Sequence, residues 1–239
     1  MNSKTELISS IRLFRTSPHA CSYKADEIAV TVFVDPELEI DQDLNSKLSE
    51  LGYRRSGAHL YRPDCDNCNA CVSCRLPVQS FQQQRRHKKI WKKNQDLYVK
   101  EAAVVDDKNS FELYEKYINT RHSDGDMYPA TIEQFEAFIC SGTSTTRFLK
   151  FFLEDRLVAV SVTDQLSQGL SAVYTFFDPD LNSRSLGNYV ILWQVEEARR
   201  LLLPYVYLGY WIKDCQKMAY KSSFRPLELF IDGNWLLLR

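Results

Sequence analysis

The chain has 239 residues with a formal net charge of −1; 44% of the residues are hydrophobic and 26% are charged, the balance of a globular protein with a sizeable core. No apolar run reaches the roughly 20 residues of a transmembrane helix, and the N-terminus lacks a signal-peptide pattern. These features exclude a membrane-embedded or disulfide-stabilised secreted class. We expect a cytoplasmic protein without membrane contact, whose seven cysteines are metal ligands or free thiols.

The first part of the chain, residues 1–95, is predicted to form a small, irregular, cysteine-bearing domain. An apolar run predicts a strand over residues 28–34. A helix is predicted over residues 41–51, because Leu44, Leu48 and Leu51 share one face and a glycine follows. A short strand is expected at residues 76–78.

A dense group of cysteines lies between these elements. Cys65, Cys68, Cys71 and Cys74 recur at three-residue steps, and thiolates at this spacing can reach one metal ion or cluster. The alternative is a chance grouping of small buried residues. Cys140 lies in an apolar, helix-like stretch and is assigned to the core.

A basic run follows the cysteines and closes the first domain. Residues 85–93 read RRHKKIWKK, six cations without an acid on an otherwise acidic chain. Such a patch attracts a phosphate backbone, and the tryptophan in it could stack on a base. A solvated helix face or a linker between domains is the competing interpretation.

The second part, residues 96–239, alternates regularly between strands and helices. The elements predicted in chain order are a strand (97–105), helices (110–121 and 131–142), three strands (147–153, 157–165 and 169–177), a helix (186–202), a strand (205–211), a short helix (215–223) and a strand (227–231). Short turns between the three consecutive strands predict an antiparallel meander. The order is that of an N-acetyltransferase-like domain, so the predicted class is α+β, with a mixed, mostly antiparallel sheet flanked by helices.

The loop that would bind coenzyme A in such a domain is poorly suited to it here. The turn before the long helix reads Arg184-Ser185-Leu186-Gly187-Asn188-Tyr189, and Tyr189 fills a place where a small residue lets the backbone approach a pyrophosphate. An acyl-coenzyme A N-acetyltransferase is therefore disfavoured, although it stays open as an alternative.

Several motifs, in order along residues 18–235, carry a resemblance to a known family. They are YVYLGYWIKDCQKMAYKSSFRP at 205–226, SAVYTFFDP at 171–179 followed by SLG at 185–187, and, in the first domain, CSY at 21–23, RRSG at 54–57 and YRP at 61–63. Together they resemble the arginyl-tRNA–protein transferase family, and the short length and cysteine spacing look most like its bacterial, leucine-transferring branch.

The resemblance implies transfer of leucine from leucyl-tRNA to the N-terminal α-amine of proteins that begin with Asp or Glu, which marks them for degradation by the N-degron pathway. The ester of an aminoacyl-tRNA is already activated, so the chemistry requires no cofactor. An arginyl donor within the same family and a metal-dependent RNA-binding module remain alternatives.

The resemblance also suggests roles for residues within the matched motifs. Acceptor recognition needs a cation, because a carboxylate must be told from its amide; the candidates are Arg54, Arg55, Arg75, Lys217, Lys221 and Arg225. Positioning of the amine or the tRNA 3′ end is assigned to Tyr174, Asp178, Tyr207 and Tyr220. A backbone amide around residues 173–175 is a candidate for stabilising the oxyanion.

The same resemblance implies which ligands the basic run and the cysteines bind. The tRNA acceptor arm would contact Arg85, Arg86, Lys88, Lys89, Trp91, Lys92 and Lys93. Some family members bind an iron–sulfur cluster through the N-terminal domain, and zinc would suit the same thiolates. The family pattern favours Cys21, Cys65, Cys68 and Cys71 as ligands. Cys74 departs from that pattern, and we expect it to be either an alternative ligand or a spare thiol.

Overall fold

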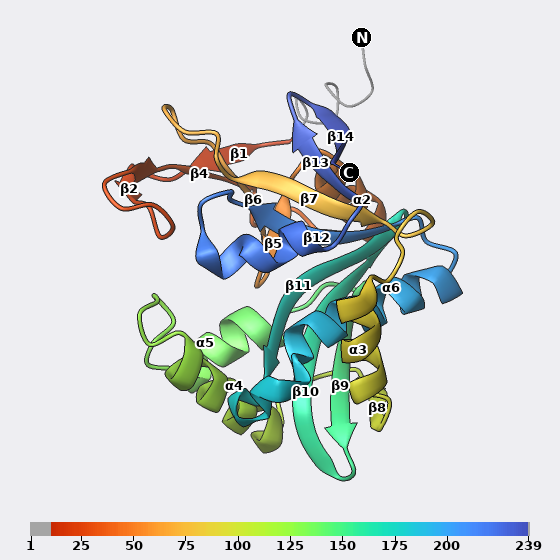
Figure 1. The fold of residues 1–239 in the computed structure, drawn as a ribbon. Helices are drawn as coiled ribbons and strands as arrows, with labels where there is room; N and C mark the ends of the chain where they lie inside the picture. Colours follow the sequence, from red (N-terminus) through yellow and green to blue (C-terminus); the bar gives the residue numbers. More distant parts are fainter. Residues whose placement is uncertain (1–10, 239) are drawn as a thin grey trace.

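The N-terminal part is built around a small antiparallel sheet. In the computed structural model, which describes residues 11–238, this sheet has the strand order β1-β4-β6-β5 and lies beside a two-stranded ribbon, β2-β3 (Figure 1). Its elements are β1 (Leu13–Arg15), β2 (His19–Ala20), β3 (Ile28–Ala29), β4 (Thr31–Val34), α2 (Gln42–Glu50), β5 (Arg54–Ser56) and β6 (His59–Pro63). The predicted helix α2 is confirmed. It begins after Asp41, whose carboxylate accepts a hydrogen bond from the amide of Leu44 at 2.8 Å.

An eight-stranded sheet forms the larger part of the molecule, in the order β14-β13-β7-β12-β11-β10-β9-β8. Its strands are β7 (Val72–Pro77), β8 (Leu97–Ala102), β9 (Thr146–Leu153), β10 (Arg156–Leu166), β11 (Gly169–Phe177), β12 (Tyr205–Trp211), β13 (Leu227–Ile231) and β14 (Asn234–Leu238). All neighbours are antiparallel except β11 and β12, which are parallel. The predicted α+β class and the predicted meander of β9, β10 and β11 are confirmed.

Helices cover both faces of this sheet (Figure 1). They are α3 (Arg85–Lys93), α4 (Lys108–Arg121), α5 (Ile132–Phe135) and α6 (Leu186–Arg200), with the 3-10 helices η2 (Pro179–Arg184) and η3 (Gln216–Ser223) and the π-helix η1 (Glu136–Cys140). One face packs on α3 and α6, and the opposite face packs on α4, α5 and η1. In the range 11–238, no helix is both long and apolar enough to cross a bilayer.

Two predicted helices differ from the helices in the structure. The one expected at 131–142 begins as α5, with the hydroxyl of Thr131 accepting from the amide of Gln134, but continues as the π-helix η1. The one expected at 215–223 is the 3-10 helix η3. Both segments border the site described below, and π-helical turns are frequent at functional sites.

Strand β7 links the two parts of the chain. It follows the cysteine cluster in sequence, yet it lies inside the large sheet, paired with β12 on one side and β13 on the other. Only its last residues were predicted as a strand. A boundary between two domains near residue 95 stays a prediction, because β7 comes from the first part and completes the sheet of the second.

The parallel strands β11 and β12 diverge soon after they begin. Their register covers only Gly169–Ser171 against Tyr205–Tyr207, after which the two strands run apart (Figure 1). Each strand has an irregularity just beyond that point. In β11 the register with β10 shifts between the pairs Val162–Tyr174 and Thr163–Ala172, so that Val173 is the bulged residue. In β12 the register with β7 shifts between Tyr207 and Gly209.

Candidate active site

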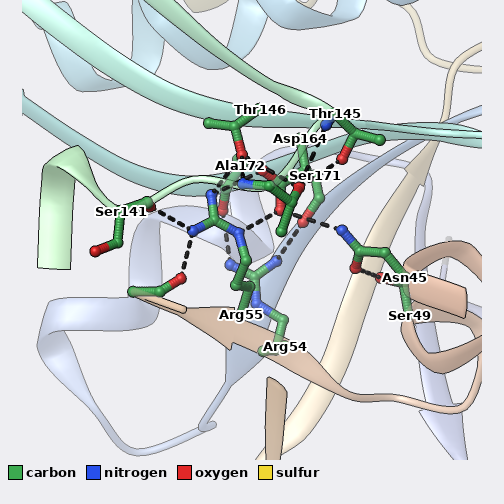
Figure 2. Close-up of polar contacts among 12 residues, drawn as sticks. Asn45, Ser49, Arg54, Arg55, Ser141, Thr145, Thr146, Asp164, Ser171 and Ala172 are labelled. Atoms are coloured by element: carbon green, nitrogen blue, oxygen red, sulfur yellow. Dashed lines mark hydrogen bonds and ion pairs between the residues drawn. The ribbon is translucent and has the colours of Figure 1, made fainter. Parts of the chain in front are cut away.

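Arg54 and Arg55 lie next to each other on β5 but point to opposite faces of the small sheet, as alternate residues of a strand do. The Arg55 side chain is 1% exposed and forms a 2.6 Å ion pair with the equally buried Asp164 of β10. Its guanidinium makes five hydrogen bonds, two of them to the carbonyl oxygens of Gly57 and Ser141 (Figure 2). These contacts give Arg55 a structural role between the two sheets and leave no donor free for a substrate.

Arg54 extends instead to the start of the divergence between β11 and β12. Its Nη1 donates to Ser171 Oγ at 3.2 Å, and its Nη2 donates to the carbonyl oxygen of Ala172 at 2.6 Å (Figure 2). Within residues 11–238 no carboxylate pairs with this guanidinium. Gly209 of β12 makes room for it, because a Cβ there would lie 2.9 Å from guanidinium atoms of Arg54. Gly209 also has φ +83°, which favours glycine.

Lys221 of η3 is the second cation at this place. It is 7% exposed, and its ammonium donates to the carbonyl oxygen of Tyr210. Burial lowers the pKa of Lys221 to about 8, and Arg54 contributes in the same direction. None of the described residues places a carboxylate against this ammonium either. Two cations without an acidic partner, one half-buried and one buried, form a site suited to a ligand carboxylate.

Cys74 belongs to this site and not to the cysteine cluster. Its thiol is buried and donates to the carbonyl oxygen of Gly209 at a sulfur–oxygen distance of 3.2 Å. Burial raises the pKa of this thiol, whereas Lys221 and Arg54 lower it. The expectation that Cys74 serves as an alternative metal ligand is therefore not supported by its position. Tyr220, which precedes Lys221, is 43% exposed beside it.

Tyr174 lies on β11, directly after the bulge at Val173. Its ring meets Phe138 of η1 edge-on at 4.9 Å, and its hydroxyl donates to the Met127 sulfur at 3.8 Å. Burial raises the pKa of Tyr174 above its ordinary value, which keeps the hydroxyl protonated and able to donate. The structure thus brings Arg54, Lys221, Tyr220 and Tyr174 toward the region where β11 and β12 separate.

Other predicted site residues have internal partners. Asp178 is buried, binds Lys116 at 2.8 Å and also pairs with Arg156, and its carboxylate caps η2. It follows the far end of β11, about 20 Å from Ala172 at the rise of an extended strand.

Four more candidates also have partners within the chain: Arg75, Tyr207, Lys217 and Arg225. Arg75 pairs with Glu228 at 2.6 Å and donates to Tyr207. Lys217 pairs with Asp124 at 2.8 Å on the surface. Arg225 donates from Nε to the carbonyl oxygen of Ser222, but its Nη1 is buried without a partner among the described residues.

The basic run forms helix α3, and its cations lie on the exposed side: Arg85, Arg86, Lys88, Lys89, Lys92 and Lys93. Trp91 is half-buried and packs on Tyr189 with ring centroids 5.5 Å apart. The inward face consists of His87, Ile90, Trp91 and Asn94, a spacing of i, i+3, i+4 and i+7 that is readable in the sequence. The lysines and arginines are thus placed for phosphate contacts, whereas the indole contributes to the core.

Cys140 of η1 packs against the hydrophobic core, and the remaining cysteines gather near Cys71. Burial raises the pKa of its thiol to about 11, and Cys21, Cys65, Cys68 and Cys215 add to that shift through their proximity. Sequence reasoning missed Cys215, which comes from the segment before η3. The Cys65 thiol contacts the backbone of Val30, and no group of three candidate ligands in residues 11–238 has the spacing of a metal site. Metal binding by these thiols therefore stays a prediction.

Comparison with known proteins identifies relatives over nearly the whole chain. The model for the N terminus of arginine-tRNA-protein transferase matches residues 19–89, and the model for its C terminus matches residues 109–231. An aspartate/glutamate leucyltransferase of Pseudomonas fluorescens (strain Pf0-1) is 51% identical over 98% of this chain and 99% of its own length. One of Alcanivorax borkumensis is 52% identical over 95% and 94%. Among solved structures, FemX has a TM-score of 0.47 at 8% identity, covering 90% of this chain and 83% of FemX, a likeness too distant to carry an inference.

Proposed function

The chain belongs to the arginine-tRNA–protein transferase family, and we propose that it transfers leucine from leucyl-tRNA to the N-terminal amine of proteins that begin with Asp or Glu. The relatives named as aspartate/glutamate leucyltransferases, about half identical over full length, support this donor and these acceptors. Such a reaction belongs in the cytoplasm, where tRNA is aminoacylated.

The observation that carries the proposal is the pair of cations without an acidic partner. Arg54 is anchored on Ser171 and Ala172, and Lys221 on Tyr210, so both are held in place before a ligand arrives. An acceptor side-chain carboxylate would supply the missing negative charge, whereas the amide of Asn or Gln would not. Charge-assisted hydrogen bonds of this kind contribute about 1.5–3 kcal/mol each, enough to select an acid over its amide.

The bulge at Val173 lies next to Ala172, to which Arg54 is bound. A bulged residue leaves its backbone groups outside the regular ladder, so the Val173 amide is available to the carbonyl oxygen of the ester. The α-amine attacks that carbonyl carbon, a C–N bond forms, and the C–O bond to the tRNA ribose breaks with a proton passing to the ribose oxygen. We assign Tyr174, whose hydroxyl stays protonated, to the positioning of the reacting groups.

Deprotonation of the α-amine does not require a strong base. An N-terminal amine has a pKa of about 7.7–8.0, so a fraction near a tenth is neutral at pH 7. Holding that amine against an activated ester converts a bimolecular reaction into a local one, an effect worth several kcal/mol. The exposed cations of α3 are assigned to the phosphates of the tRNA acceptor arm.

A transfer assay tests the proposal. The purified protein is incubated with radiolabelled leucyl-tRNA or arginyl-tRNA and with peptides that begin with Asp, Glu, Asn or Ala. We expect label from leucyl-tRNA on the Asp and Glu peptides only. Label from arginyl-tRNA would identify arginine as the transferred amino acid. Absence of transfer from either tRNA, with protein prepared anaerobically, would refute the enzyme function.

A further inference from the structure

An apolar groove of about 320 Å³ lies on the N-terminal sheet, outside the reaction site. It is lined by Phe14, Phe33, Val34, Pro36 and His59. Phe14 is 45% exposed and belongs to β1, the edge strand of its sheet. A contiguous apolar patch in a groove, unlike a single exposed apolar side chain, is typical of a surface that binds a ligand or partner.

The register of the small sheet relates the groove to the cation site. Phe14 of β1 is paired with Phe33 of β4, Phe33 with Tyr61 of β6, and Tyr61 with Arg54 of β5. Directly paired residues point to the same face of a sheet. The aromatic row Phe14–Phe33–Tyr61 therefore leads across one face from the groove to Arg54, with Phe33 and Tyr61 ring centroids 5.9 Å apart.

The length of this row matches a short stretch of extended polypeptide. Neighbouring strands are about 4.8 Å apart, so the backbones of Arg54 and Phe14 are separated by about 14 Å. An extended peptide rises about 3.3 Å per residue. A chain whose first residue binds Arg54 and Lys221 would thus reach the groove with its third to sixth residues.

The charges beside the groove favour a polypeptide over RNA. Arg12 pairs with Asp35 at 3.6 Å, and Arg15 pairs with Asp64 at 3.2 Å and with Asp66 at 2.8 Å. The cations next to β1 are therefore neutralised, whereas binding of a phosphate backbone requires unpaired ones. We propose that this groove binds apolar side chains of the acceptor protein at about positions 3–6, so that the enzyme reads acceptor sequence beyond the first residue.

This inference rests on the proposed function. Two peptides allow the inference and the proposed function to be tested separately. One peptide begins Asp-Ala and is too short to reach the groove; the other also begins Asp-Ala and carries Leu and Phe at positions 4 and 5. The measured quantity is the ratio of kcat/KM for the long peptide to that for the short one. We expect a ratio well above one for the unmodified protein, and a fall in that ratio of about fivefold in Phe14→Ser, the loss of roughly 1 kcal/mol of apolar contact.

Leu237→Ser is the matched control, because Leu237 is 48% exposed on β14, the edge strand of the large sheet. It should keep the unmodified ratio. If Phe14→Ser does not fold, His59→Ser, at an exposed lining residue, replaces it. An unchanged ratio in the groove variant would overturn the inference alone. So would a rise in the KM for leucyl-tRNA, which would assign the groove to RNA, or a change in sedimentation, which would assign it to a second copy of the chain. Absence of transfer to both peptides by the unmodified protein would refute the proposed function and the inference together.

Discussion

Two adjacent arginines on β5 have different roles, because successive side chains of a strand point to opposite faces of the sheet. Arg55 points into the space between the sheets and neutralises Asp164, whereas Arg54 points to the other face, where no described carboxylate meets it. The sequence motif identified both as candidate substrate ligands. It could not separate them, because the acid that neutralises Arg55 lies 109 residues away.

Removal of Arg55 should destabilise the protein strongly. In Arg55→Ala the Asp164 carboxylate stays buried, with Asn45 and Thr146 as remaining donors. Breaking a buried ion pair costs about 3–5 kcal/mol, and we expect a decrease of that size in the free energy of unfolding measured in urea. Lys47→Ala, which removes the exposed pair with Asp43, is the control and should have little effect. Equal decreases in both variants would contradict the structural role of Arg55.

The pKa of Lys221 predicts a pH dependence of acceptor choice. Burial lowers this pKa to about 8, so the ammonium is charged below pH 8 and loses its proton as the pH rises through that value. Loss of this proton weakens the pair of cations. The ratio of kcat/KM for an Asp peptide to that for an Asn peptide should therefore fall above pH 8. Both peptides carry an N-terminal amine, so most of the effect of its titration cancels in this ratio.

Lys217→Met serves as the control for that measurement. Lys217 lies on the same 3-10 helix but is exposed and pairs with Asp124, so its removal should leave the pH profile as in the unmodified protein. A ratio that stays constant from pH 7 to 9.5 in the unmodified protein would show that Lys221 does not read the carboxylate.

At the scale of elements, α3 is a cationic helix with an inward face. The sequence analysis identified the run of charges and assigned Trp91 to the RNA, but Trp91 packs on Tyr189. The spacing of His87, Ile90, Trp91 and Asn94 already indicates this inward face, because such a spacing places four residues on one side of a helix. The run of charges and the buried face are both encoded in the same nine or ten residues.

Replacement of cations on α3 should weaken the binding of tRNA without affecting the binding of the acceptor peptide. In the triple variant Lys88→Ala, Lys89→Ala and Lys92→Ala, we expect a higher KM for leucyl-tRNA. The slope of log KM against log salt concentration should decrease by about 2, since each phosphate contact contributes roughly 0.7–0.9. Lys108→Ala, at an exposed position on α4, should leave the slope unchanged. An unchanged slope in the triple variant would remove α3 from the RNA interface.

Over the whole molecule, the order of strands and helices from residue 97 to residue 231 was predictable from periodicity and turns, because it depends on local pattern; the final strand β14 was missed. The position of β7 was not predictable. A strand of six residues between a cysteine cluster and a basic helix carries no sign that it pairs with β12 and β13, which lie more than 120 residues later in the chain. The separation of Cys74 from the cysteine cluster has the same origin, since Cys74 lies within β7 and the other clustered thiols do not.

The shared strand predicts that the second part does not fold alone. A fragment of residues 96–239 lacks β7 and would leave β12 and β13 with unpaired edges in the middle of the sheet, together with a buried Asp164 that has lost Arg55. We expect no cooperative thermal unfolding by circular dichroism, in contrast to the full chain. A cooperative transition close to that of the full chain would establish residues 96–239 as an independent domain.

The most direct test of the central claim is the discrimination between Asp and Asn peptides by Arg54 variants. For Arg54→Gln we expect kcat/KM on an Asp peptide to fall about 10–100-fold, the equivalent of roughly 1.5–3 kcal/mol, with an unchanged KM for leucyl-tRNA. Activity on the Asn peptide should change little, and Lys217→Gln should keep the unmodified ratio. If Arg54→Gln retains the unmodified preference for Asp over Asn, the cation pair of Arg54 and Lys221 is not the acceptor site.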